Sequence, residues 1–128
     1  MAKDLFSKFA QQYQSFRPTY PPELFEFIYR HTNNFDTAWD CATGNGQAAI
    51  VLANKFRKVY ATDISQSQLA HATQANNVEY STVAAEDTKF ADGTFDLITV
   101  VQAAHWFNHD LFYHEAKRVA KKGATLAL

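Results

Sequence analysis

The sequence has 128 residues, of which 47% are hydrophobic and 15% aromatic, enough for one domain with a single core. The formal net charge of −1 argues against a nucleic-acid-binding protein that depends on a basic surface, and the lone Cys41 excludes an internal disulfide framework. No segment has the apolar length of a membrane span, and the first eight residues lack the apolar region of a secretory signal, so we expect a cytoplasmic protein.

Within this single domain, the first 36 residues are expected to form an N-terminal helical segment, a lid on the substrate side. Aromatic residues at helical spacing predict a helix over Lys3–Phe16. Three prolines between positions 18 and 22 interrupt it, and a second helix is predicted from Pro22 to about His31. The buried side of this second helix is expected to consist of Leu24, Phe25, Ile28 and Tyr29.

From residue 37 onward, short apolar runs alternate with helical stretches. Strands are predicted over Thr37–Cys41, Lys58–Ile64, Val78–Ala84, Phe95–Gln102 and Ala124–Leu128. Helices are predicted over Gly46–Phe56 (with Ile50, Val51 and Phe56 facing inward), from Ser65 to about Gln74, and over Asp110–Lys121, with Gly123 as C-cap. This alternation predicts an α/β fold with a parallel sheet and flanking helices. Because the chain stops as the fifth strand ends, we also expect a core that lacks further C-terminal strands and could form a homodimer through its exposed edge.

The turn after the first strand carries the strongest functional signal. The segment from Asp40 to Ala49 holds two glycines, which let the backbone turn sharply and let a ligand approach closely. Asp63 ends the second strand about twenty residues later, where an acidic residue accepts the hydroxyls of a ribose. Together these features predict an adenosine-type cofactor. Asp40 favours S-adenosylmethionine (SAM) over NAD, because an acid there repels a pyrophosphate and suits an ammonium group.

The same segments carry a resemblance to a known family. The run Asp40–Gln47 resembles the first motif of class I SAM-dependent methyltransferases, D-x-x-x-G-x-G, and Ala85–Leu97 resembles their A-E-x-L-P-F-x-D-x-S-F-D-L segment. Residues 37–128 are therefore similar to the Rossmann-like core of methyltransferase type 11-like enzymes. Near the N-terminus Phe16–Pro21, and after the fourth strand Gln102–Phe107, are similar to the trans-aconitate methyltransferase-like group, which methylates small molecules that are often carboxylic acids.

The resemblance implies a role for each matching residue. The expected cofactor contacts are Asp40, Ala42, Gly44, Gly46, Asp63, Ile64, Ala85, Glu86 and Gln102. The residues expected to face the transferred methyl group and the substrate are His105 and Trp106, and those expected on the substrate side are Tyr13, Arg17 and Tyr20. Two alanines depart from the family pattern, because Ala42 and Ala48 stand where glycines are common.

Several alternatives stay open. His105 is either a general base or only part of the pocket wall, and Trp106 either contacts the sulfonium through its ring or is a hydrophobic plug. Arg17 either clamps a substrate carboxylate or is an ordinary surface residue. No metal site is expected. At the level of function, the alternatives to a small-molecule methyltransferase are a SAM-binding module without activity, an NAD-dependent oxidoreductase and a nucleic-acid methyltransferase.

Overall fold

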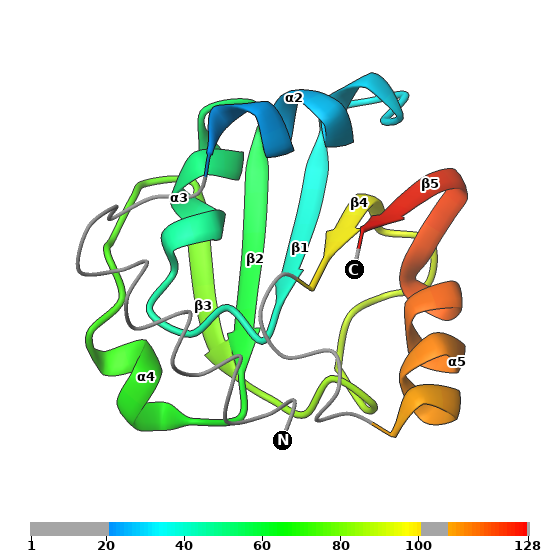
Figure 1. Cartoon of the computed structure of the whole chain (residues 1–128). Helices are drawn as coiled ribbons and strands as arrows, with labels where there is room; N and C mark the ends of the chain where they lie inside the picture. Colours follow the sequence, from blue (N-terminus) through cyan, green and yellow to red (C-terminus); the bar gives the residue numbers. More distant parts are fainter. Residues whose placement is uncertain (1–20, 101–107, 128) are drawn as a thin grey trace, which may run out of the picture.

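A computed structural model of the chain describes residues 21–100 and 108–127. Four helices and five strands follow one another as α2 (Pro22–Arg30), β1 (Thr37–Cys41), α3 (Gln47–Ala53), β2 (Lys58–Asp63), α4 (Gln66–Ala70), β3 (Val78–Thr82), β4 (Phe95–Thr99), α5 (His109–Val119) and β5 (Ala120–Ala127) within these ranges (Figure 1). The predicted helix over Lys3–Phe16 lies outside them. No helix in the described ranges has the length and apolar character needed to cross a membrane.

The five strands form one parallel sheet in the order β3-β2-β1-β4-β5. This order confirms the predicted α/β fold with a Rossmann-like parallel sheet. All five residues of β1 and all five of β4 are buried, because helices cover both faces of the sheet at its centre. Figure 1 shows the strands running toward the end of the sheet near α4, with α2 at the opposite end.

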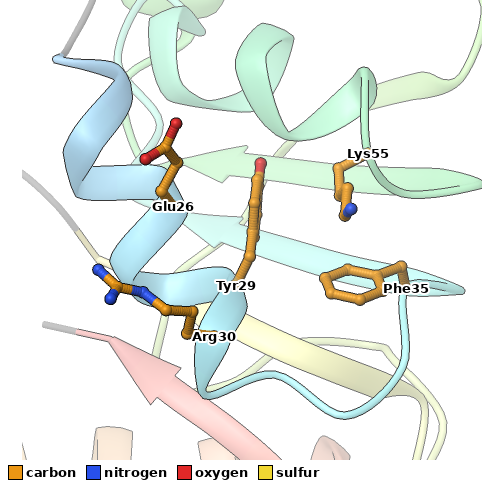
Figure 2. A pocket seen from close by; sticks show the side chains of 5 residues that line it. All are labelled: Glu26, Tyr29, Arg30, Phe35 and Lys55. Carbon is orange, nitrogen blue, oxygen red and sulfur yellow. The ribbon is translucent and has the colours of Figure 1, made fainter.

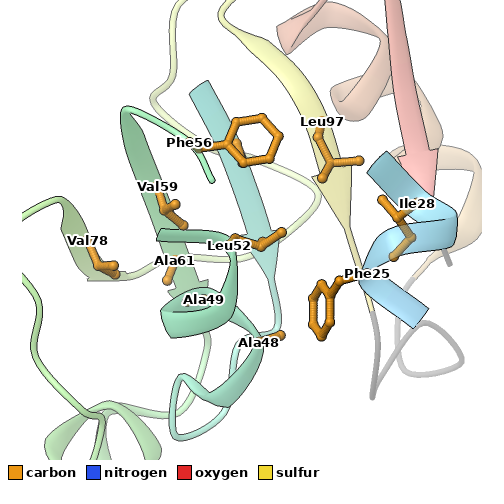
Figure 3. Packing of buried hydrophobic residues seen from close by; sticks show 11 residues of the cluster. Phe25, Ile28, Ala48, Ala49, Leu52, Phe56, Val59, Ala61, Val78 and Leu97 are labelled. Carbon is orange, nitrogen blue, oxygen red and sulfur yellow. The ribbon is translucent and has the colours of Figure 1, made fainter. Parts of the chain in front are cut away.

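Alternate residues of the central strands feed two hydrophobic clusters on opposite faces of the sheet. On one face, Ala38 and Leu97 join α2 and α3, where Phe25 and Ile28 point toward Leu52 (Figure 3). On the other face, Trp39 and its neighbours pack against α5. There the aromatic rings meet at centroid distances of 4.9–6.2 Å in the pairs Trp39–Phe90, Trp39–Phe95, Trp39–Phe112 and Phe90–Phe95. Such pairs add to the free energy gained from burial itself.

The buried faces of the first two described helices differ in part from those expected. In α2, Phe25 and Ile28 are buried as predicted, but Leu24 is 37% exposed. In α3 the buried residues are Ala48, Ala49 and Leu52, whereas Ile50 and Val51, expected to face inward, are half-buried. The two small alanines let this helix pack closely on the sheet. A buried face predicted from the spacing of large apolar side chains does not include such small residues. Phe56 is buried as expected, in the turn that follows.

The C-terminal helix ends earlier than its sequence suggests. Gly123 is not a C-cap: α5 stops at Val119, and Ala120 adopts extended geometry and begins β5 directly. Pairing of β5 with β4 is irregular, since Phe95 pairs with Ala120 but Leu97 pairs with Thr125. Gly123, at φ +82°, lies in the extra length of β5 that this irregularity absorbs. The long-range pairing with β4 therefore overrides the local cap signal.

Candidate functional site

The candidate site lies where the parallel strands end. Because parallel strands present their carboxyl ends at one edge, the sheet brings together the segments that follow β1, β2 and β3. The amide of Thr43 donates to the Thr62 carbonyl at 2.8 Å, which joins the turn after β1 to the end of β2. The predicted cofactor residues Asp40, Gly44 and Asp63 thus lie in one neighbourhood.

The turn after β1 has an alternating left-handed backbone. Ala42, Gly44 and Gly46 have φ values of +56°, +60° and +85°. Two of these positions are glycines, which adopt such angles without steric cost. Ala42 carries a Cβ in the same region and is the only non-glycine residue with positive φ in the described parts of the chain. A family glycine would suit this position for the same physical reason, so the alanine leaves local strain in the turn.

Asp40 is completely buried beneath this turn, with 0% of its surface exposed. One carboxylate oxygen accepts a hydrogen bond from the Thr43 hydroxyl and the other from the Thr99 hydroxyl, each at 2.7 Å. The pKa of Asp40 is raised to about 6, mainly by burial and to a smaller extent by the charge of Asp63, although the hydrogen bonds from Thr43 and Thr99 act in the opposite direction. A buried carboxylate with two neutral donors is short of positive charge. It is therefore suited to a cationic ligand group.

Asp63 is half-buried and joins the two turns. Its Oδ2 accepts from the Gly44 amide at 2.9 Å and its Oδ1 from the Ser65 amide at 2.8 Å. Ser65 supplies the N-cap of α4 by accepting from the Gln68 amide at 3.3 Å, so the cap does not depend on Asp63. Each carboxylate oxygen has a second lone-pair direction left for a ligand hydroxyl. Beside it, Ile64 is 77% exposed and offers an apolar surface to a planar group.

The segment after β3 is attached firmly to α5. Ala85 is buried, and the Glu86 carboxylate accepts from the Asn108 amide at 3.0 Å, just before α5 begins. Further along, the Thr88 amide and hydroxyl both donate to Glu115 Oε2, at 2.7 and 2.5 Å. Arg118 donates to both oxygens of Glu115, which lowers the pKa of that carboxyl to about 2. These bonds hold the predicted adenine-side residues in place.

This attachment is absent from the predictions made from the sequence. Glu115 interrupts the apolar face of the predicted C-terminal helix, and a buried acid on such a face is a signal for a buried partner. Nothing local identified the partner as Thr88, 27 positions earlier.

Other expected site residues fall outside the described ranges. Gln102, His105 and Trp106 belong to residues 101–107, and Tyr13, Arg17 and Tyr20 to residues 1–20. Their roles stay predictions. Within the described ranges, no group of three or more histidine, cysteine or acidic side chains could hold a metal ion. The Cys41 thiol is buried, and burial raises its pKa well above the usual range.

One surface groove of about 540 Å³ lies away from the carboxyl edge, between α2 and the end of α3. Figure 2 shows Tyr29 rising from α2, with Glu26 on one side and Phe35 and Lys55 on the other. The Lys55 ammonium lies 4.6 Å from the centre of the Phe35 ring. The Tyr29 hydroxyl is buried without a hydrogen-bond partner among the described residues, and burial raises its pKa to about 12. None of the expected cofactor residues lines this groove.

The proteins that match this chain in sequence are methyltransferases. A family model described as a methyltransferase domain matches residues 39–128. A Dictyostelium discoideum protein named a candidate methyltransferase is 43% identical over 126 residues, covering 98% of this chain and 48% of that protein. A methyltransferase of Claviceps purpurea is 29% identical, covering 98% of this chain and 42% of its own length. The chain thus spans about half the length of the curated relatives it matches.

Solved structures agree with the sequence matches. A candidate type II methyltransferase from Anaeromyxobacter dehalogenans superposes with a TM-score of 0.81 at 38% identity, covering 87% of this chain and 48% of that one. A SAM-dependent methyltransferase from Aquifex aeolicus superposes with a TM-score of 0.65 at 26% identity, covering 75% of this chain and 57% of that one. Both matches agree with the expected fold.

Proposed function

Because this chain belongs to the methyltransferase domain family, we propose that its carboxyl-edge site binds SAM for transfer of the methyl group to a small-molecule acceptor. Membership of the family implies SAM as the cofactor. The observation that carries the proposal is the buried Asp40 carboxylate under a turn of positive φ angles. The NAD-dependent oxidoreductase alternative gains no support from the relatives.

The described residues fit SAM through complementary chemistry. The Asp40 carboxylate has no cationic side chain among its hydrogen-bond partners, so the ammonium of the methionine part would supply the missing positive charge. The Asp63 oxygens retain lone pairs for the two ribose hydroxyls. Ile64 would offer the adenine an exposed apolar surface, and Ala85 and Glu86 are proposed to border its edge.

The contribution of the protein to the reaction is mainly positional. When bound, SAM supplies a methyl group already activated by the positive sulfonium. The turn after β1 and the ends of β2 and β3 would hold the methionine, ribose and adenine parts in a fixed orientation. Orientation of this kind lowers the barrier of a direct transfer without a covalent intermediate. His105 and Trp106 are proposed to face the methyl group, and Gln102 to line the cofactor.

The acceptor is proposed to be a carboxylic acid or related metabolite, as in the trans-aconitate methyltransferase-like group. Arg17 would then pair with the substrate carboxylate, while Tyr13 and Tyr20 would close over the site. A SAM-binding module without activity is the second candidate. The edge strand β5, with Leu126 39% exposed, is the proposed place for a homodimer contact, which sedimentation would detect.

The test is calorimetric titration of the chain with S-adenosylhomocysteine, with NAD as the control ligand. We expect S-adenosylhomocysteine to bind and Asp63→Ala to weaken it at least tenfold, since the ribose hydroxyls lose their acceptor. Glu26→Ala is the matched control, because this exposed acid on α2 borders the distant groove. Binding of NAD alone, or equal weakening by both variants, would contradict the proposal.

A further inference from the structure

Tyr80, a half-buried residue of β3, connects two segments that flank the glycine turn. Its hydroxyl donates a hydrogen bond of 2.6 Å to the carbonyl of Thr73, in the segment between α4 and β3. The amide of the same Thr73 donates to the carbonyl of Asn45, inside the glycine turn, at 3.4 Å. Thr73 is therefore hydrogen-bonded to the glycine turn through its amide and to Tyr80 through its carbonyl.

The same tyrosine also contacts the turn through its ring. A Cβ placed on Gly46 would overlap the Tyr80 hydroxyl oxygen and lie 3.0 Å from both Cε1 and Cζ. Gly46 is buried, and the Tyr80 side chain fills the space that a larger residue at position 46 would need. Position 46 thus requires glycine for two independent reasons, its φ of +85° and the tyrosine beside it.

Gly46 also sets the start of α3. It is the residue just before the helix, and its carbonyl accepts from the Ile50 amide at 3.0 Å. Its own amide donates to the Thr43 carbonyl at 3.0 Å. A displacement of Gly46 would therefore shift the turn above Asp40 and the first amides of α3 together.

We propose that Tyr80 is a positioning residue of the cofactor site, holding the second half of the glycine turn against β3 through its ring and through Thr73. The inference rests on the proposed SAM site for its consequence on binding. The competing explanation is that Tyr80 is only a core residue, since it packs against the hydrophobic cluster that α2 and α3 form with the sheet. A core role affects stability alone, whereas a positioning role also changes the turn and the ligand affinity.

The first test is Tyr80→Phe, which keeps the ring and removes the hydroxyl. Loss of one hydrogen bond should weaken S-adenosylhomocysteine binding roughly two- to tenfold. In the ligand-free chain, the Gly46 and Thr73 amides should exchange with solvent at least about threefold faster. Tyr60→Phe is the matched control, because Tyr60 lies on the neighbouring strand and its ring packs against Phe90 and Phe95 on the other face.

The second test is a double-mutant cycle between positions 46 and 80. Gly46→Ala should weaken binding less in a Tyr80→Ala background than in the wild-type chain, because all three of its closest contacts belong to the tyrosine. Additive effects, or unchanged amide exchange and affinity in Tyr80→Phe, would overturn the proposal. If the wild-type chain does not bind S-adenosylhomocysteine at all, the proposed cofactor fails, and the exchange data alone decide whether Tyr80 positions the turn.

Discussion

Replacing Asp40 with asparagine should make the protein more stable and a weaker cofactor binder at the same time. The carboxyl is fully buried, with a pKa raised from 3.8 to about 6. At neutral pH the folded chain therefore holds a charge in a place that disfavours it. A shift of about two pKa units corresponds to roughly 3 kcal/mol, the upper limit of the stability that the charge removes.

Asparagine can preserve the local hydrogen bonds. Its amide oxygen can accept from one threonine hydroxyl, and its amino group can donate to the oxygen of the other. The Asp40→Asn variant should therefore be more stable than the wild-type chain at pH 7.5, by up to about 3 kcal/mol. Its affinity for S-adenosylhomocysteine should fall roughly ten- to a hundredfold, because the ammonium group loses the attraction of the buried carboxylate charge beneath the turn.

The pH dependence identifies the group responsible. With a folded pKa raised above 3.8, the stabilising contribution of protonated Asp40 is complete below about pH 4 and is lost as pH rises through about 6. The advantage of Asp40→Asn should thus be small near pH 4 and grow up to about pH 6.5. Urea unfolding of both chains across this range measures it, with the exposed-acid variant Glu26→Gln as control. A less stable variant at pH 7.5, or an advantage independent of pH, would refute the reasoning.

Three further predictions concern the surroundings of the site. Ala42→Gly should raise the free energy of unfolding by about 0.5–1 kcal/mol in a denaturant titration. The free-energy cost of holding an alanine at φ +56° exceeds the entropic cost of ordering a more flexible glycine. A less stable variant would show that Ala42 is not strained. Glu115→Gln should cost about 2 kcal/mol at pH 7, since Thr88 and Arg118 lose a charged acceptor. That cost should shrink as pH falls below about 4.5 toward 2, where the wild-type carboxyl also becomes neutral, and a cost independent of pH would exclude this explanation. Cys41 should react with a thiol reagent only at the rate of unfolding, because it is buried with a raised pKa, and fast labelling of the native chain would show that β1 opens locally.

Local patterns predicted the elements around the glycine turn well. Strand β1 has the bounds that its apolar run predicts, and Asp40, Gly44 and Asp63 lie at one edge of the sheet, as their positions at strand ends predict. These predictions are correct because they depend on short-range signals: an apolar run, glycines where a turn must form, and an acid at the end of the next strand. Parallel topology then brings the strand ends together without further information.

Features that depend on distant contacts escaped prediction. The sequence around Gly123 has the signature of a helix end, yet pairing with β4 makes this residue part of an irregular strand. The side of Gly46 filled by Tyr80 and the bond between Thr88 and Glu115 join residues far apart in the chain. The inward alanines of α3 were missed because the larger Ile50 and Val51 dominate a periodicity reading. In each case the tertiary structure decides between locally equivalent arrangements.

The most direct test of the central claim is to map the amide chemical shifts of the ¹⁵N-labelled chain while S-adenosylhomocysteine is added. We expect shifts concentrated at the carboxyl edge of the sheet, at Gly44, Gly46, Ile64 and Ala85, with little change at Arg30 and Lys55 around the separate groove. Shifts confined to that groove, or none at saturating ligand, would contradict a SAM site at the ends of β1, β2 and β3.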